Sequence, residues 1–271
     1  MAQKAEAVEI ILHRIEDESQ KYALKLNQGK CIHVQMNAIH KIHFKQGNSV
    51  PIQTQADYLG GKFKNTGDHK PKLRHRISAT WNTVRRLDIL WGKSRASTKW
   101  KIRVYDAVIV TKLMYGLTSI PLSRADANKL DAFHMRGLRK ILKVKHPYWS
   151  RVSNKKLLEM ANEKLGNEQD KNCLRKLSSR LIERQIVLFA HTIRLEEQDP
   201  LKKISIDEAG NRVRSDFRRT GRPRTKWYDT TRNHVIRKLI KEGHLPRNIL
   251  NESTKQEINE LIVQMAQNRH I

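Results

Sequence analysis

The spacing of apolar residues predicts a mostly helical chain with a short extended region near its start. Apolar side chains recur at steps of three and four from Ala2 to Leu26, which predicts an amphipathic helix. From Cys31 to Phe63 the period changes to two, which predicts short strands, and Gly47-Asn48 predicts a turn between two of them. Because so few strands are marginal without a wider sheet or a covering helix, we expect them to form the edge of something larger.

From Asp68 onward the apolar period is helical. The expected helices span 68–91, 100–117, 124–144, 171–196, 227–241 and 254–266, with a short one opening at Ser153-Asn154. The helix over 100–117 is apolar around most of its circumference, so we expect it to be the buried central helix. The segment from Asp199 to Lys226 breaks the period and contains Pro200, Gly210, Gly221 and Pro223, which predicts a linker.

These patterns together predict an α+β, predominantly α fold. A small antiparallel sheet with an N-terminal helix precedes a helical bundle, and a basic helical C-terminal extension follows it. We find no internal repeat.

The charge balance indicates a polyanionic partner. Lys and Arg total 54 against 27 acids, a net charge of +27, which is far more than solubility requires. The first helix is balanced up to Lys30, but thirteen bases face two acids between Lys62 and Arg103. The candidate nucleic-acid contacts in that stretch are Arg74, Arg76, Arg85 and Arg86. Charge alone also fits a ribosomal-type or merely basic protein.

Other compositional features exclude several classes of protein. The only cysteines are Cys31 and Cys173, which rules out a disulfide framework and a four-thiolate zinc site. Three histidines near the predicted strands lack cysteine or carboxylate partners, so we expect no metal site at His33, His40 and His43. No apolar run is long enough to span a membrane, and Met1 opens no signal peptide. We therefore expect an intracellular protein, nuclear or cytoplasmic, with no membrane partner.

Two phrases flank the extended region. The first, Leu24-Lys25-Leu26-Asn27-Gln28-Gly29-Lys30-Cys31, closes the first helix, and the second, Ala56-Asp57-Tyr58-Leu59-Gly60-Gly61-Lys62-Phe63, runs into two glycines. With the helices after them, these phrases resemble the end of the palm of a reverse transcriptase, more narrowly that of a non-LTR (LINE-type) retroelement. Three later phrases resemble the thumb and carboxyl end of the same family: Arg136-Gly137-Leu138-Arg139-Lys140-Ile141-Leu142, Ser153-Asn154 and Ala190-His191-Thr192-Ile193-Arg194-Leu195.

The resemblance implies roles for particular residues. Lys30 would stand in the fourth palm motif as the general acid for the leaving pyrophosphate, since an ammonium beside a phosphate can donate a proton or stabilise developing charge. Its alternative is a solvated lysine at a strand start. Tyr58, Leu59, Gly60 and Gly61 would form the primer-grip hairpin, where glycine lets two backbones approach closely. The alternative there is an ordinary hairpin corner.

The resemblance also implies a division of the chain. Residues 1–66 would be a partial palm, 67–163 the helical thumb, 164–198 a connecting helix, and 199–271 a basic linker with C-terminal helices. In the complete palm the strands of this region lean on the strand pair that carries the catalytic aspartates. We therefore expect Ile32, Val34, Met36 and Phe44 to face water, and the region before about Gly61 to be the less stable half.

A required element of this family is absent from the sequence. Nucleotidyl transfer needs carboxylates that hold two metal ions, and the Tyr-Ala-Asp-Asp phrase that supplies them does not occur. The family pattern would put it a few residues before Met1, so we expect a truncated, catalytically silent polymerase. This chain would need no cofactor, and Mg²⁺ only in the complete polymerase. It would retain the holding of an RNA/DNA template–primer duplex, and the missing upstream segment is a possible partner.

An arginine-rich stretch supports an alternative. Arg212 to Lys226 carries seven bases and only Asp216. Within it, Arg218, Arg219, Arg222 and Arg224 surround Gly221 and Pro223 in a phrase that resembles an AT-hook, which reads a narrow A·T minor groove. In LINE-type elements Gly-Arg-Pro before a tryptophan helix is common, so we favour a basic loop ending at Trp227. The alternative function is a stand-alone, chromatin-type DNA/RNA-binding protein. A third hypothesis is a structural helical bundle with no nucleic-acid role, and the high net positive charge argues against it.

Overall fold

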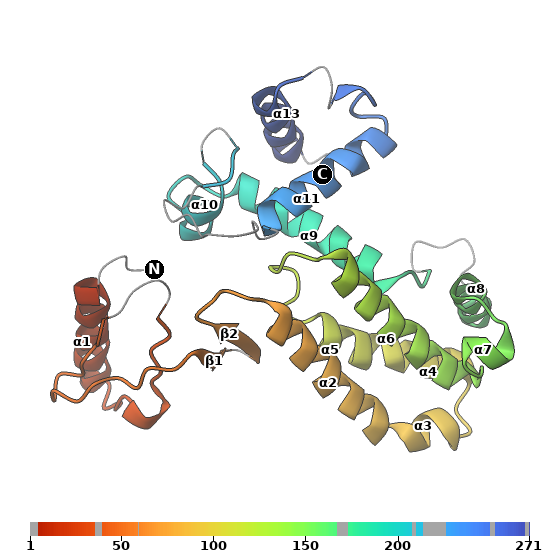
Figure 1. The fold of residues 1–271 in the computed structure, drawn as a ribbon, viewed down its shortest axis with the longest axis horizontal. Helices are drawn as coiled ribbons and strands as arrows, with labels where there is room; N and C mark the ends of the chain where they lie inside the picture. Colours follow the sequence, from red (N-terminus) through yellow and green to blue (C-terminus); the bar gives the residue numbers. More distant parts are fainter. Residues whose placement is uncertain are drawn as a thin grey trace. The chain divides into compact units, whose positions relative to one another are not determined.

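Helices make up most of the chain in the computed structural model, and the fold is α+β, predominantly α, as predicted (Figure 1). The structure describes residues 5–35, 40–58, 60–166, 173–207, 210–213, 226–249, 253–268 and 271. The chain divides into two compact units, Met1–His75 and Arg76–Ile271. The boundary falls inside helix α2 (Lys70–Arg86).

Unit 1 is built on helix α1 (Ala5–Lys21), a 3₁₀ turn η1 (Gln28–Lys30) and the strands β1 (Gln55–Tyr58) and β2 (Gly61–Lys64). The strands pair antiparallel, with Ala56 opposite Phe63 and Tyr58 opposite Gly61. The core of this unit is small. Its buried members are Ile42, Phe44 and Val50, and Val8, Leu12, Leu26 and Cys31 pack against them.

The other predicted strands of unit 1 are not formed. Over 31–35 and 40–52 the backbone makes only single bridges, His33 with Ile52 and His43 with Ser49. Side chains of α1 bond the extended backbone instead, since Glu9 accepts from the His43 N–H at 2.8 Å and Glu16 from the Lys45 N–H at 3.1 Å. Such bonds satisfy donors that a neighbouring strand would otherwise take.

The predicted turn at Gly47 is confirmed. Gly47 has φ +86°, and its N–H donates to the Phe44 carbonyl at 2.8 Å. The expectation that Phe44 faces water is wrong, because its side chain is only 3% exposed in the core that α1 covers. Ile32 is 40% exposed, Val34 is half-buried, and Met36 lies outside the described residues.

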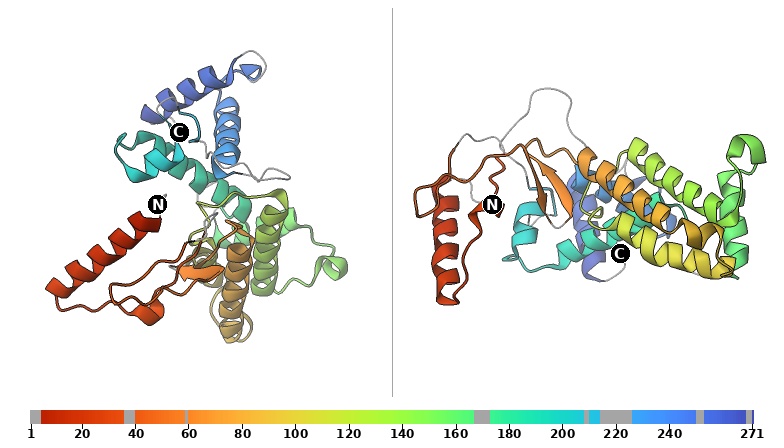
Figure 2. Two further views of the ribbon diagram at one scale, coloured as in Figure 1. Left: turned by 60° about the vertical axis from the view of Figure 1, so that its left-hand side comes forward. Right: turned by 90° about the horizontal axis from the view of Figure 1, so that it is seen from below.

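Unit 2 begins with the rest of α2 and continues through short and long helices around a central one. In chain order these are α3 (Asp88–Gly92), α4 (Thr98–Val104), the π-helical turn η2 (Tyr105–Val110), α5 (Thr111–Met114), α6 (Arg124–Leu142), α7 (Pro147–Ser150) and α8 (Asn154–Leu165). Serine caps begin α4, α6 and α8, where the hydroxyls of Ser97, Ser123 and Ser153 accept from the third backbone N–H. Figures 1 and 2 show α2, the α4–α5 helix and α6 lying side by side.

The prediction of a buried central helix is confirmed for one face only, since Val108 is 44% and Tyr115 is 56% exposed, and the middle of the helix is a π-turn. Tyr105, Ile109, Leu113 and Leu117 are each 0% exposed, at steps of four residues. In a regular α-helix such steps drift by about 40° each, which would carry the last residue away from the core. The wider i→i+5 turn at η2 takes more residues into one turn and so offsets part of that drift.

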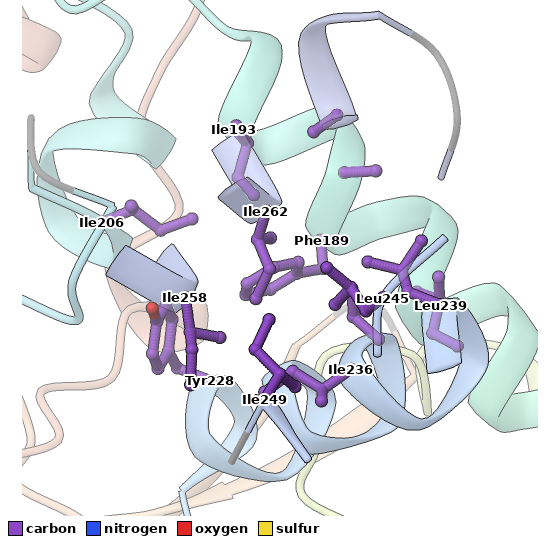
Figure 3. Packing of buried hydrophobic residues seen from close by; sticks show 14 residues of the cluster. Phe189, Ile193, Ile206, Tyr228, Ile236, Leu239, Leu245, Ile249, Ile258 and Ile262 are labelled. Carbon is purple, nitrogen blue, oxygen red and sulfur yellow. The ribbon is translucent and has the colours of Figure 1, made fainter. Parts of the chain in front are cut away.

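Helix α9 (Leu177–Arg194) joins this bundle to a second core (Figure 3). It begins later than predicted, because the Asn162 side chain of α8 bonds both the N–H and the carbonyl of Leu174, which keeps Leu174 out of the helix. The second core is formed with α10 (Pro200–Ser205), α11 (Trp227–Lys241) and α13 (Lys255–Gln267). Its central side chains include Phe189, Ile236, Leu239, Ile258 and Ile262.

The two C-terminal helices match the prediction, and a capping box at Thr254 and Glu257 begins the second. The linker prediction is wrong at its start. Residues Pro200–Ser205 are helical, and Ile206 is 3% exposed in the second core. Residues 208–209, 214–225 and 250–252 lie outside the described part.

Candidate nucleic-acid interface

The helices of unit 2 place five cationic side chains on and beside α2, and we call this group the arginine face. It comprises Arg76, Arg85 and Arg86 of α2, Lys112 of α5 and Arg136 of α6. The Arg76 guanidinium lies 4.7 Å from the centre of the Tyr115 ring, and that of Arg136 lies 4.3 Å from the Trp81 ring. Stacking on an aromatic ring fixes a guanidinium while leaving its N–H edge free to bond.

The spacing along α2 places the remaining cations beside these pairs. Arg85 is one turn from Trp81 and therefore neighbours the Arg136 stack. Arg86 is one turn from Thr83, whose hydroxyl accepts from the Lys112 ammonium at 2.7 Å. On one flank of α2, Arg85 therefore lies beside the stacked Arg136. On the other flank, Arg86 lies beside the hydrogen-bonded Lys112.

The bundle core supports this surface. Trp81 meets Phe133 edge-to-face at 5.5 Å, and the Trp91 indole N–H donates to the Val84 carbonyl at 3.0 Å. Val84 and Trp91 are each 1% exposed. Because its inner side is packed in this way, α2 presents its arginines from a rigid element.

The arginine face carries uncompensated charge. Within the described residues, none of its five cations is paired with a carboxylate, whereas Lys140 pairs with Asp88 at 2.6 Å and Arg180 pairs with Asp106. Exposed unpaired cations on a rigid surface can each neutralise a phosphate and release a counterion. The surface suits a backbone-directed contact with nucleic acid, which carries no base specificity.

The structure assembles part of the predicted set of arginines. Arg76, Arg85 and Arg86 belong to the arginine face, and Arg74 is exposed on the part of α2 that lies in unit 1. Arg218, Arg219, Arg222 and Arg224 lie outside the described residues.

The sequence prediction missed Lys112 and Arg136. The only sequence signal for Lys112 is its polar position in an otherwise apolar helix. Arg136 pairs with Trp81 across two helices far apart in the sequence, which no local pattern indicates.

Lys30 is exposed at the end of η1, where its N–H donates to the Asn27 carbonyl at 3.0 Å. Among the described residues no hydrogen bond or ion pair joins it to the β1–β2 hairpin. The structure therefore places Lys30 as a solvated side chain, and it does not bring together a phosphate site around it.

The β1–β2 hairpin forms where the second phrase predicted a corner. Gly60 takes the left-handed conformation at φ +68°, which favours glycine. Gly61 is buried, and a β-carbon there would approach the Lys72 side chain to 3.1 Å. Tyr58 is 64% exposed, so it is not the core tyrosine of an ordinary corner. Leu59 lies outside the described residues.

A buried polar pair lies behind the arginine face. The Tyr105 hydroxyl is 3.4 Å from His134 Nδ1, the rings stack at 5.7 Å, and both residues are 0% exposed. Burial raises the pKa of Tyr105 and lowers that of His134 to about 4. The charged groups around His134 are Arg180, which lowers its pKa further, and Asp106 and Asp131, which raise it. No substrate can reach this pair, so we assign it to the core.

The described residues do not fit a two-metal catalytic centre. Across them, no three His, Cys, Asp or Glu side chains gather in a way that could hold a metal ion. No helix in the described part is long and apolar enough to cross a membrane. Comparisons with protein-family models, curated proteins and solved structures found no match to this chain.

Proposed function

We propose that this chain binds the backbone of a nucleic-acid duplex through the arginine face, as the non-catalytic carboxyl-terminal part of a LINE-type reverse transcriptase. The observation that carries the proposal is the group of cations fixed on α2, α5 and α6, unpaired with carboxylates among the described residues. The net charge of +27 supports it. The family assignment rests on the sequence phrases, and the duplex it implies is an RNA/DNA template–primer.

The charge distribution favours binding over a structural role. A protein with no polyanionic partner gains nothing from self-repelling arginines on a rigid helix, and the compact state is destabilised by them. The acids present pair with other cations, such as Lys140 and Arg180, and leave the arginine face bare.

The test compares two triple variants with equal charge change. In the first, the exposed arginines Arg85, Arg86 and Arg136 of the arginine face are replaced by Glu. In the control, the replaced residues are Arg184, Arg237 and Arg247, three exposed arginines of α9, α11 and the loop after α11. Affinity for a fluorescent template–primer duplex is measured by anisotropy over a range of salt concentrations.

The first variant should bind more weakly, and the slope of log affinity against log salt should fall by about one for each phosphate that the protein no longer neutralises. The control should keep the wild-type slope. Equal losses in both variants would mean that only net charge matters, and no binding by the wild type would end the proposal. A preference for A·T-rich duplex that disappears only when 212–226 is deleted would favour the chromatin-type alternative.

A further inference from the structure

The short helix α7, at the edge of unit 2 between α6 and α8, exposes two aromatic rings (Figure 1). Tyr148 is 64% exposed and Trp149 is 75% exposed. Trp149 is the most exposed large apolar side chain in the described part of unit 2. An indole left in water loses the stabilisation that burial would give it, so its exposure calls for a binding role.

The two rings are held in a defined arrangement. Their centres are 5.0 Å apart with planes at 88°, and the Arg151 guanidinium lies 5.7 Å from the centre of the Tyr148 ring. Pro147 begins α7, and the His146 ring accepts from the Tyr148 N–H at 3.4 Å. We call Tyr148 and Trp149 the aromatic platform.

A buried arginine fixes the chain beneath the platform. Arg139 of α6 is 8% exposed, and its guanidinium donates to the carbonyls of Lys145 at 3.1 Å and Val152 at 2.7 Å, on either side of α7. It also reaches the side chains of Ser150 at 3.4 Å and Asn154 at 3.3 Å. Four acceptors on one planar group hold both ends of the connection, so the platform is presented rigidly.

The chain segment that carries the platform has charge of one sign. No Asp or Glu occurs from Ala132 to Leu158. The cationic side chains nearest in sequence to the platform are Lys143, Lys145 and Arg151, and all three are exposed. Aromatic rings among unpaired cations are the arrangement with which proteins bind single strands, stacking on bases while cations follow the backbone.

We propose that Trp149, supported by Tyr148, stacks on an unpaired base of single-stranded nucleic acid, with the neighbouring cations on the flanking phosphates. This inference rests on the proposed function and extends it from duplex backbone to single strand. Bases within a duplex are already stacked on one another, so the platform acts on a strand that has left or not yet entered one. A membrane surface is disfavoured, because α7 has four residues and offers no long apolar helical face.

The test separates base stacking from charge attraction. Wild-type protein and the variants Trp149→Ala, Trp149→Phe and Trp100→Ala bind a single-stranded oligonucleotide and an abasic strand of equal length and charge. Trp100, an exposed tryptophan of α4, is the matched control. We expect Trp149→Ala to lose about fivefold or more in affinity for the base-containing strand and nothing for the abasic strand. Trp149→Phe should keep most of the affinity, and Trp100→Ala all of it.

Two outcomes would overturn the inference. Unchanged discrimination between the two strands in Trp149→Ala would show that the ring does not stack on bases. A loss confined to anionic phosphatidylserine vesicles would assign the platform to a membrane surface. In either case the duplex assay with the arginine variants still reports on the proposed function, so the two failures are distinguishable.

Discussion

Gly137 of α6 lies against the buried ring of Tyr105, and replacing it with Ala tests how tightly the two helices pack. A β-carbon at Gly137 would lie 2.5 Å from the Tyr105 hydroxyl oxygen, 2.6 Å from Cε2 and 2.7 Å from Cζ. The ring cannot move aside easily. It is 0% exposed, stacks on His134 and meets Trp91 edge-to-face at 6.4 Å.

Two opposing effects set the magnitude. Ala in a helix interior is favoured over Gly by about 1 kcal/mol. Forcing a methyl group into a packed core costs roughly 1–3 kcal/mol, and three sub-contact distances to an immobile ring place this site at or above the upper end. We expect Gly137→Ala to lower the free energy of unfolding by about 2 kcal/mol, which for a unit of this size is a fall in Tm of about 4–8 °C.

The assay is urea denaturation of the full chain, with Gly92→Ala as the control. Gly92 ends α3, has no heavy atom within 4 Å of a built β-carbon, and has no positive φ. Its replacement should leave stability equal or slightly raised. The double variant Tyr105→Leu/Gly137→Ala should lose less than the sum of its two single variants, because Leu vacates the space that the new methyl group needs. Wild-type stability in Gly137→Ala, or strict additivity in the double variant, would refute the packing argument.

Because burial holds the pKa of His134 at about 4, the unfolded chain binds a proton that the folded chain does not, and stability should fall as the pH falls from about 6.5 to about 4, by up to about 3 kcal/mol. A His134→Gln variant measured by urea denaturation at both ends of that range should lack this part of the pH dependence; an unchanged dependence would contradict the assignment. Hydrogen exchange followed by mass spectrometry should be faster in unit 1 than in the helices of unit 2, because the hydrophobic cluster in the described part of unit 1 has only three buried members. Equally slow exchange in both units would contradict this prediction. Purified protein with primed RNA, deoxynucleotides and Mg²⁺ should not extend the primer, and protein-dependent extension would disprove catalytic silence.

The helices were predictable because their signals are local. The apolar period predicted the first and last residues of α11 and placed both ends of α13 within one residue. The prediction of strands between Cys31 and Ile52 was wrong, because side chains of α1, about 30 residues earlier, accept from the backbone N–H groups of His43 and Lys45. Helix α10 was wrongly predicted as linker, because Ile206 after it is buried by helices that come later in the chain.

In the candidate interface too, local sequence indicates some residues and only the fold identifies the others. A local excess of charge indicated Arg85 and Arg86 on α2. The stacking of Arg136 on Trp81 requires α2 and α6 to be adjacent, which only the fold determines. The aromatic platform could have been noticed as Tyr148-Trp149 among lysines, but two adjacent aromatic residues are equally typical of a core, and only their exposure distinguishes the cases.

The π-turn in the central helix makes this chain tolerant of a change of length at one point. A π-turn holds one residue more than an α-turn, so deletion of one residue there, such as exposed Ala107, would let η2 become a regular α-helix at little cost in hydrogen bonds. The residues beyond it would keep nearly their present directions, so Leu113 and Leu117 would stay in the core, and Lys112 and Tyr115 would still meet Thr83 and Arg76. A deletion within the regular helix α6 has no such turn to absorb it and would rotate every later residue by about 100° around the helix axis.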